Sequence, residues 1–399
     1  MNKAKNKTPI ATQPNPSAMT SKKGRVLVAM SGGIDSTVTA VMMRQAGYEV
    51  IGMTMKTWDY ESSGGNKKET GCCSLDSIND ARAIAVENGI HHFILDIRDE
   101  FGDYVIDDFV SEYAAGRTPN PCVLCNTHIK WQALLRRADQ LGCDYIATGH
   151  YASIRHEDGR YIISRGRDTH KDQSYVLWGL GQANMARTLL PLGGYRKDEI
   201  RALALEWGYH ELVQKSESYE ICFIPDNDYR SFLKRRRPEL GNLRGGEYRL
   251  TDGTVVGHHE GFPFYTVGQR RGLNIALGYP VYVIDIDPEE NVIYLGQEHE
   301  LQRRGMIVGN INLQKYDRIP EAGLEAVAKI RYKHDGAHCR IFPEVDGNLQ
   351  VVFYHGVDAI APGQSAVFYE GDDVIGGGHI QKSFHIGDDD PVLLESAAH

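Results

Sequence analysis

The chain has 399 residues, which is longer than one ordinary hydrophobic core supports, so two or three domains are expected. Hydrophobic residues make up 41% and charged residues 24%, as in globular proteins, and no run of about 18 apolar residues predicts a membrane span. The formal net charge of -9 argues against a nucleic-acid partner only as an average, because RNA binding needs no more than a local basic face.

The first residues are polar and lack the apolar segment of a signal peptide, so residues 1–23 are predicted to be a disordered tail. Without a secretion signal, seven cysteines indicate reduced cytoplasmic thiols and not a disulfide framework. These cysteines are Cys72, Cys73, Cys122, Cys125, Cys143, Cys222 and Cys339.

An apolar, β-prone run ends at Met30 and leads into a loop, Ser31–Ser36, after which helical periodicity continues to Gly47. Two adjacent glycines allow the loop backbone to approach a ligand closely, and hydroxyls lie beside the positive end of the following helix, which suits a phosphate. The loop contains neither G-x-x-x-x-G-K-[ST] nor G-x-G-x-x-G, and it resembles the pyrophosphate loop of the N-type ATP pyrophosphatases. A plain Gly-Ser turn before a helix is the alternative.

Strands and helices alternate over the next hundred residues. Strands are predicted at 49–55, 91–97 and 144–150, and helices at 76–89, 99–116 and 129–142. This alternation predicts an α/β doubly wound parallel sheet within residues 24–222, whose ligands bind outside the carboxyl ends of the strands. Ser31–Ser36 and Gly149–His150 would share that edge, although a structural histidine at a turn is the alternative for His150.

The pattern changes at about Phe223. Short apolar runs at 264–267 and 281–286 between Gly-rich segments predict a small, largely β central domain over residues 223–301. Alternating stretches at 326–332, 339–345, 349–354, 365–369 and 374–380 predict a C-terminal antiparallel β-barrel over residues 302–386, followed by a frayed tail at 387–399. Between Arg230 and Arg249, seven basic residues stand against two glutamates, which allows RNA binding or a solvated helix face.

Two cysteine segments are candidates for chemistry. Thr118–Asn126 combines prolines, asparagines and a C-x-x-C immediately before a predicted helix, and a thiol near a helix N-terminus has a lowered pKa. Cys222 lies among apolar residues, where a small core side chain is the alternative to a reactive thiol.

Taken together, these motifs make the chain similar to the MnmA family, the bacterial tRNA-specific 2-thiouridylases. The similarity runs from about Arg25 to Ile380 and rests on eight motifs in order: Ala29–Ser36, Met53–Trp58, Gly116–Pro121 with Cys125–Asn126, Ala147–Tyr151, Lys171–Tyr175, Ile221–Ile224, Thr266–Leu273 and Pro362–Tyr369. The resemblance implies an ATP pyrophosphatase domain, a central domain and a β-barrel that clasp the anticodon stem-loop of tRNAs for Lys, Glu and Gln. It also implies a sulfur donor protein, either a cysteine desulfurase or a relay carrier.

The resemblance implies roles for particular residues. Cys125 would be the nucleophile and Cys222 the persulfide carrier. ATP would be held by Ala29, Met30, Ser31, Gly32, Gly33, Ile34, Asp35, Ser36, Met55 and Gly149. The target base would contact Asn120, Pro121 and Cys122, and further tRNA contacts would come from His150, Lys171, Asp172, Gln173, Arg331, Tyr332 and Gln364.

The chemistry expected from these roles has two stages. Attack of the uracil C2 oxygen on the α-phosphate of ATP turns that oxygen into a leaving group, with Mg2+ and the loop stabilising the pyrophosphate and Asp35 a direct or water-mediated Mg2+ ligand. Sulfur then comes by one of two routes. Either the outer sulfur of a persulfide carried on Cys222 attacks C2 directly, or Cys125 attacks that persulfide, which releases hydrosulfide and forms a disulfide. The family often has Asp where this chain has Cys122, so the acid/base group is not assigned.

Three other functions are compatible with parts of this pattern. Cys122, Cys125 and Cys222, with Cys72 or Cys73, suggest an iron–sulfur or zinc site, although the chain has no second C-x-x-C. Another adenylating synthetase would use the same loop without needing the cysteine pair. A non-catalytic RNA-binding module would need neither Asp35 nor the thiols.

Overall fold

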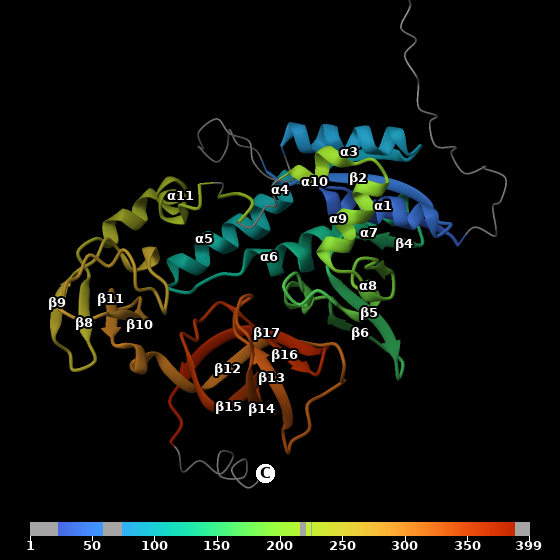
Figure 1. Ribbon diagram of the computed structural model, residues 1–399. Helices are drawn as coiled ribbons and strands as arrows, with labels where there is room; N and C mark the ends of the chain where they lie inside the picture. The colour runs from blue at the N-terminus through green and yellow to red at the C-terminus, as the bar shows by residue number, and fades with distance from the viewer. Residues whose placement is uncertain (1–22, 59–73, 216–220, 225, 388–399) are drawn as a thin grey trace, which may run out of the picture.

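The computed structural model describes residues 23–58, 74–215, 221–224 and 226–387. The chain forms three parts around a common centre (Figure 1): an α/β part in blue to green, a small β part in yellow to orange, and a barrel in orange to red. Within the described ranges, no helix is long and apolar enough to cross a membrane.

The α/β part is built on a parallel sheet with strand order β3-β2-β1-β4-β7. Its strands are β1 (Arg25–Ala29), β2 (Glu49–Lys56), β3 (His91–Asp96), β4 (Tyr145–Ala147) and β7 (Thr188–Leu189). The main covering helices are α1 (Ile34–Gln45), α3 (Leu75–Glu87), α7 (Trp131–Gln140) and α9 (Lys197–Glu206). The order reverses between β1 and β4, so the crevice at their carboxyl ends is the expected ligand position.

Strand β1 shows why this sheet is doubly wound. Val26 and Val28 pack on one face in a core shared with α1, α3 and α9, whereas Leu27 packs on the other face against Trp131 and Leu134 of α7. Alternate side chains point to opposite faces of a strand, so a strand apolar at both sets of positions must be covered on both faces. The predicted doubly wound sheet is confirmed.

The helices between β3 and β4 are more broken than their periodicity indicates. The single helix predicted at 99–116 is instead α4 (Arg98–Phe101), a π-helical turn (Gly102–Ile106) and α5 (Asp107–Ala114). The C-x-x-C does not precede a helix but lies inside one, because α6 (Pro121–Leu124) continues into a π-helical turn (Cys125–Lys130) and then α7. Proline is favoured at the first helical position, so Pro121 starts this helix earlier than expected.

The central part is a four-stranded sheet with strand order β10-β11-β8-β9. Its strands are β8 (Glu247–Leu250), β9 (Val255–His258), β10 (Tyr282–Asp287) and β11 (Val292–Gly296), and α11 (Tyr229–Arg236) precedes them. The strand expected at 264–267 is wrong: residues Phe262–Phe264 form a 3-10 turn whose two aromatic rings are buried. Pro263 has no N–H to donate to a sheet, which disfavours a strand at this point.

The C-terminal part is the predicted antiparallel barrel, with strand order β12-β15-β14-β13-β16-β17 closed by pairing of β12 with β17. Its strands are β12 (Gln302–Leu313), β13 (Leu324–Lys329), β14 (Ala337–Pro343), β15 (Leu349–Asp358), β16 (Ser365–Glu370) and β17 (Asp373–Phe384). A hairpin from the α/β part, β5 (Ala152–Glu157) and β6 (Arg160–Arg165), adds to the edge of β17. This hairpin was not expected from the sequence, and it joins the first part to the last.

Three smaller helices complete the α/β part: α8 (Gln182–Met185), α10 (His210–Gln214) and a 3-10 turn at Ser174–Leu177. Two further 3-10 turns lie at Pro238–Leu243 and Glu298–Leu301.

Asp373 fastens the hairpin to the barrel. Its carboxylate, 13% exposed, accepts hydrogen bonds from Ser164 Oγ at 2.8 Å and Lys315 Nζ at 2.7 Å, and it pairs with Arg155. Burial raises the pKa of Asp373. Together, the hydrogen bonds from Arg155, Lys315 and Ser164 lower this pKa by more than burial raises it, so the pKa lies below its usual value.

We therefore expect Asp373→Ala to lower the free energy of unfolding by about 2–4 kcal/mol, because it leaves partly buried cations unpaired. Chemical denaturation at pH 7 measures this loss, and Asp372→Ala, at the exposed neighbouring side chain, is the matched control. Because the pKa of Asp373 is depressed in the folded state, its contribution is present above about pH 4 and is lost as the pH falls through the folded pKa. Equal stability of the two variants at pH 7 would contradict this assignment.

Candidate functional site

The loop between β1 and α1 is shaped by its own hydroxyls. Ser36 Oγ accepts a hydrogen bond from the Ser31 backbone N–H at 3.1 Å and donates to the Gly33 carbonyl at 3.0 Å. Gly33 is the N-cap residue of α1, with no side-chain cap, so the first N–H groups of the helix remain available for an anion. Gly32 has a φ of +75°, and a Cβ there would lie 2.1 Å from the Ser77 carbonyl oxygen, so only glycine fits.

Asp35 of α1 is held by an ion pair that the sequence does not reveal. Both of its carboxylate oxygens lie 2.8 Å from Lys197 Nζ, and one accepts a hydrogen bond from the Tyr151 hydroxyl at 2.7 Å. Lys197 is the first residue of α9 and is only 6% exposed. A buried lysine keeps its charge only when it is paired, so Asp35 and Lys197 hold each other in place beneath the loop.

A cavity of about 230 Å3 opens beside this loop, at the carboxyl ends of β1, β2 and β4. Seven of the ten residues predicted to bind ATP line it, whereas Gly32, Gly33 and Ile34 do not. The seven are Ala29, Met30, Ser31, Asp35, Ser36, Met55 and Gly149. The ATP assignments themselves stay predictions, but the structure brings most of them together in one cavity.

The same cavity is lined by residues that the sequence analysis missed. Thr54 Oγ1 donates to the Met30 carbonyl at 2.7 Å, and Lys130, Trp131 and Thr148 complete the wall. Lys130 follows Cys125 by five residues, but the sequence alone does not show that the helix carrying both residues runs along this cavity. Gln173 also lines the cavity, and its side-chain oxygen accepts from the Tyr151 backbone N–H.

His150 lies in the wall of the cavity beside the loop, against Trp131 of the helix that follows the C-x-x-C. Its Nδ1 lies 2.8 Å from Thr148 Oγ1, and its ring lies 5.4 Å from that of Trp131. Burial, assisted by the Lys130 ammonium, lowers the pKa of His150 to about 3. The ring is therefore neutral at physiological pH and offers hydrogen bonds without charge.

The two cysteines of the C-x-x-C differ sharply. Cys125 is buried, 6% exposed, whereas Cys122 is accessible to solvent although protein atoms crowd its thiol. This crowding raises the pKa of Cys122, and Lys130 lowers it by a smaller amount. The expectation of a lowered thiol pKa is therefore wrong for Cys122: it does lie in the first turn of α6, but desolvation of its thiol outweighs the effect of the helix N-terminus.

Cys222 is the other cysteine to which the resemblance gives a role in sulfur transfer. It is half-buried and packs against the aromatic core that contains Cys125, Phe101 and Phe223. Among the described residues, no group of three or more His, Cys, Asp or Glu side chains is placed to hold a metal ion, so the three cysteines do not form such a group here. Cys72 and Cys73 lie outside the described residues.

Two of the residues predicted to touch RNA, Tyr332 and Gln364, lie at the contact between the α/β part and the barrel, whereas His150 and Gln173 line the cavity beside the loop. Tyr332 is exposed, and its hydroxyl donates to the Asp172 carbonyl at 3.0 Å. Gln364 Nε2 donates to the Pro119 carbonyl at 2.8 Å and thus fastens the segment before Asn120 to the barrel. Asn120 caps α6 by accepting from the Val123 backbone N–H. These groups border the accessible thiol of Cys122.

Not all of the predicted RNA contacts offer a free side chain. The Asp172 carboxylate is buried and accepts from the backbone N–H groups of Gly166 and Ser174, so its side chain is structural. Lys171 is half-buried, Arg331 is exposed, and Pro121 is buried at the first position of α6. The side chains of Asp172 and Pro121 therefore position this surface, and Arg331 is directly accessible.

The basic segment between Arg230 and Arg249 is spread over a helix and a strand. Residues 234–236 are exposed on α11, as is Arg237 directly after it, and the Lys234 ammonium lies 4.9 Å from the Phe264 ring centroid. Arg249 pairs with Glu247, which reduces the charge of this segment. The exposed cations of α11 give the central part a basic edge.

Family models match the whole described architecture. They are those of the tRNA methyl transferase HUP domain at residues 24–226, the tRNA methyl transferase PRC-barrel domain at 230–297 and the aminomethyltransferase beta-barrel domain at 303–380.

Curated relatives match over nearly their full lengths. A protein of Amoebophilus asiaticus is 66% identical over 365 residues, covering 91% of this chain and 96% of that protein, and one of Cytophaga hutchinsonii is 62% identical, covering 91% and 99%. Both are named tRNA-specific 2-thiouridylase MnmA. Among solved structures, a 4-thiouridine synthetase–RNA complex with bound ATP is 18% identical, with a TM-score of 0.35, covering 54% of this chain and 51% of that one.

The Asp35–Lys197 pair leads to a prediction about nucleotide binding. Lys197→Met leaves the Asp35 carboxylate uncompensated beside the phosphate site, so the affinity for ATP is expected to fall about tenfold or more. Adding Asp35→Asn removes the repulsive charge and should restore most of the affinity. Calorimetric titration with ATP measures both, and Lys215→Met, which changes an exposed lysine paired with Asp80, is the control. Additive losses in the double variant would contradict this interpretation.

The His150 environment predicts an unusual titration. Its imidazole should stay neutral from pH 8 to about pH 4, as read from the ring nitrogen shifts by NMR and assigned with His150→Gln. Because the folded pKa is about 3 and the usual value is 6.5, the unfolded chain alone gains this proton as the pH falls from about 6.5 to 3. The group therefore lowers stability progressively through that window, and His150→Gln should show a shallower loss. A midpoint near pH 6.5 would show that the ring is solvated.

Proposed function

The chain belongs to the family of tRNA-specific 2-thiouridylases, and from this premise we propose that it is an ATP-dependent sulfurtransferase that replaces the C2 oxygen of the anticodon wobble uridine with sulfur. The products are 2-thiouridine in tRNA, AMP and pyrophosphate. The substrates are proposed to be the tRNAs for Lys, Glu and Gln, as the resemblance of the sequence motifs implies. Because the reaction uses reduced thiols, its proposed location is the cytoplasm.

One observation carries this proposal. A single continuous helical stretch, residues 121–140, holds Cys125 near its beginning and lines the nucleotide cavity with Lys130, Trp131 and Leu134 further along. Lys130 lies in the same unbroken helical stretch as Cys125, five residues further along, so one element positions both the thiol and a wall of the cavity. A base held between them can react with ATP on one side and receive sulfur from the other.

The loop and its surroundings supply the activation step. The uracil C2 oxygen attacks the α-phosphate of ATP, the bond to the bridging oxygen breaks, and pyrophosphate leaves with the electron pair. The uncapped N-terminus of α1 offers backbone N–H groups to the departing phosphates, and the hydroxyls of Ser31 and Ser36 shape the loop by hydrogen bonds within it. Lys197 holds Asp35 so that the carboxylate does not turn toward the phosphates.

Mg2+ fits this cavity as a phosphate-bound ion. The cavity wall offers it one carboxylate, that of Asp35, and both oxygens of that group are already engaged by Lys197. Phosphate oxygens and water would hold most of the ion, with Asp35 reaching it through water. When bound, Mg2+ supplies charge neutralisation for the pyrophosphate.

The cysteine pair supplies the sulfur. A donor protein, a desulfurase or a relay carrier, loads a persulfide onto Cys222, which is half-buried and therefore reachable. Sulfur then attacks C2, either as the outer persulfide sulfur or as hydrosulfide freed when Cys125 attacks the persulfide, and AMP leaves from C2. In the first route the transferred sulfur is still bonded to Cys222 after it has joined C2, so Cys125 must attack the Cys222 sulfur to cleave the S–S bond and release 2-thiouridine. Both routes therefore form a disulfide between the two cysteines, which a reductant must reopen. Cys125 and Cys222 share one aromatic core, which supports their pairing.

The target base must leave the anticodon stack to reach these groups, at an unstacking cost of about a few kcal/mol. Neutral His150 and the accessible Cys122 border the position proposed for it. With a raised pKa, Cys122 is a proton-bearing neighbour of the base and not a thiolate.

The proposal is tested by incubating the protein with ATP, Mg2+, a persulfide donor and unmodified tRNA, followed by mass spectrometry of nucleosides. We expect 2-thiouridine and stoichiometric AMP. Cys125→Ser and Cys222→Ser should each lower the rate by more than about a thousandfold while tRNA binding changes little, because each removes a reacting sulfur.

Cys143→Ala is the matched control, since this buried cysteine lies beside Arg25 and Asp144, away from the cavity. The absence of 2-thiouridine with every sulfur donor would overturn the proposed function. Full activity of either serine variant would overturn the role of that cysteine alone.

A further inference from the structure

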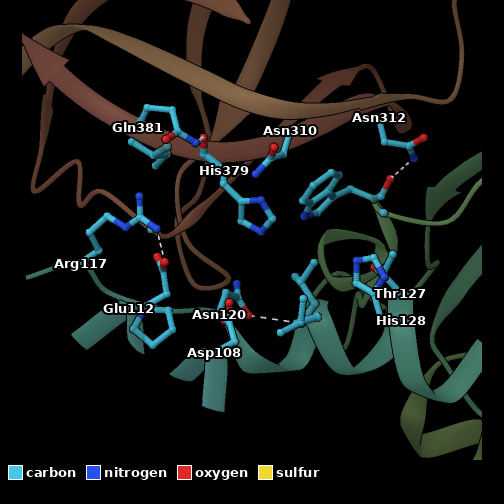
Figure 2. A pocket seen from close by; sticks show the side chains of 17 residues that line it. Asp108, Glu112, Arg117, Asn120, Thr127, His128, Asn310, Asn312, His379 and Gln381 are labelled. Atoms are coloured by element: carbon cyan, nitrogen blue, oxygen red, sulfur yellow. Dashed lines mark hydrogen bonds and ion pairs between the residues drawn. The ribbon is translucent and has the colours of Figure 1, made fainter. Parts of the chain in front are cut away.

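A second cavity, of about 580 Å3, lies on the other side of the cysteine helix, between this helix and the barrel (Figure 2). Asp108 and Glu112 of α5 and Thr127 of the helical stretch form one wall, and His379 of β17 and Asn312 of β12 form the other. Its size is in the range of small-molecule and cofactor cavities. Neither the activation step nor the sulfur transfer uses it.

Four buried polar atoms in its wall have no hydrogen-bond partner among the described residues. They are Arg117 Nε, Thr127 Oγ1, Trp178 Nε1 and His379 Nδ1. Trp178 is only 4% exposed, and its ring packs edge to face against that of His379, with 5.4 Å between the ring centroids. Folded proteins pair the great majority of buried polar atoms with hydrogen-bond partners. Four unpaired atoms around one cavity therefore indicate that the cavity binds a polar guest molecule.

The charges of the wall restrict what the guest is. Arg117 is already paired with Glu112, and Asp108 adds a second carboxyl without a cation of its own. Burial and the neighbouring Glu112 raise the pKa of Asp108 to about 6. A phosphate or carboxylate would meet these acids, so the wall disfavours an anion and suits a neutral polar group.

The hydrogen-bonding capacity of the wall is more specific. Trp178 Nε1–H and Arg117 Nε–H can only donate, so they require acceptor oxygens or nitrogens on the guest. Glu112, Asp108 and neutral His379 can accept, and they suit N–H groups on the same guest. Burial lowers the pKa of His379, which favours its neutral form. A flat heterocycle with carbonyl oxygens and N–H groups, beside two aromatic rings, meets all of these requirements.

We propose that this cavity receives an unpaired nucleobase of the RNA that flanks the target uridine, and that it favours bases with an exocyclic carbonyl oxygen. The inference rests on the proposed function, which brings an unpaired RNA loop to this helix. Asn120 lines the cavity and lies in the segment next to Cys122, and Gly363 lines it beside Gln364. Single-stranded RNA is commonly read by splaying successive bases into separate pockets.

Adenine fits this wall least well. Uracil, guanine and cytosine each present a carbonyl oxygen, whereas adenine presents only ring nitrogens and an amino group. The unpaired donors of Trp178 and Arg117 would then lose their best acceptor. The cavity would therefore contribute to the choice of RNA substrate without touching the reacting atoms.

The test uses a stem-loop RNA with the target uridine and abasic replacements at each flanking loop position, with dissociation constants measured by fluorescence anisotropy. One abasic replacement should weaken binding to the unaltered protein by about ten- to a hundredfold, as loss of a stacked base does. With Thr127→Val or Trp178→Phe, the unmodified RNA should bind more weakly and the same replacement should cost much less. Adenine at that position should resemble the abasic RNA.

These variants keep the test interpretable. Thr127→Val preserves shape and removes an unpaired hydroxyl, so the stability of the free protein should not fall. Asn310→Gly alters the exposed rim and suits the backbone there, where φ is +52°. Thr251→Val, on the central part, is the matched control.

The outcomes separate this inference from the proposed function. If the protein makes 2-thiouridine but each abasic replacement costs the same in every variant, the cavity does not bind a base and the inference is overturned. If the protein neither binds nor thiolates tRNA, the proposed function itself fails. A cost that disappears only in the cavity variants supports the inference.

Discussion

The ion pair between Asp35 and Lys197 is the interaction on which the nucleotide cavity depends. It joins the first turn of α1 to the first residue of α9, and the Tyr151 hydroxyl adds the segment after β4. Three segments that follow different strands are thereby held at one point under the loop. A buried lysine is unfavourable without its carboxylate, and the carboxylate would oppose phosphate without its lysine, so each charge requires the other. The N-terminus of α1 at this edge has no side-chain cap, which suits it to an anion.

The second constraint is that one helical stretch, residues 121–140, contributes to both proposed steps, activation by ATP and transfer of sulfur. Residues 121–140 begin beside the barrel, carry the buried thiol of Cys125 and then form a wall of the nucleotide cavity. Because one rigid element positions both groups, their separation does not depend on domain motion. Gln364 and the β5–β6 hairpin fix the barrel against this element, so a base could be held between parts that are distant in sequence.

The environment of the thiols divides their roles. Cys125 is buried and Cys222 half-buried in the same aromatic core, whereas Cys122 is accessible but has a raised pKa. A thiol that keeps its proton is a weaker nucleophile than a thiolate, so the raised pKa of Cys122 sets it apart from a reactive cysteine. Cys122 is therefore a neutral group at this position.

Sequence alone determined β1 to β4 and their parallel arrangement, five of the six barrel strands, the glycine-rich loop and the cysteine segments, because these follow from local periodicity and from residue types with few alternatives. It did not indicate β12, which closes the barrel, or the short strands β7, β8, β9 and β11. The break of the helix at 99–116, the 3-10 turn at Pro263 and the β5–β6 hairpin depend on contacts that no local pattern records. In the sequence, Lys197 and Trp178 have the pattern of ordinary helix and core residues. The fold pairs Lys197 with Asp35 and places Trp178 in the wall of the cavity beside the barrel. Burial and charge pairing belong to the assembled molecule, since they are set by neighbours far apart in the chain, and only the tertiary structure decided them.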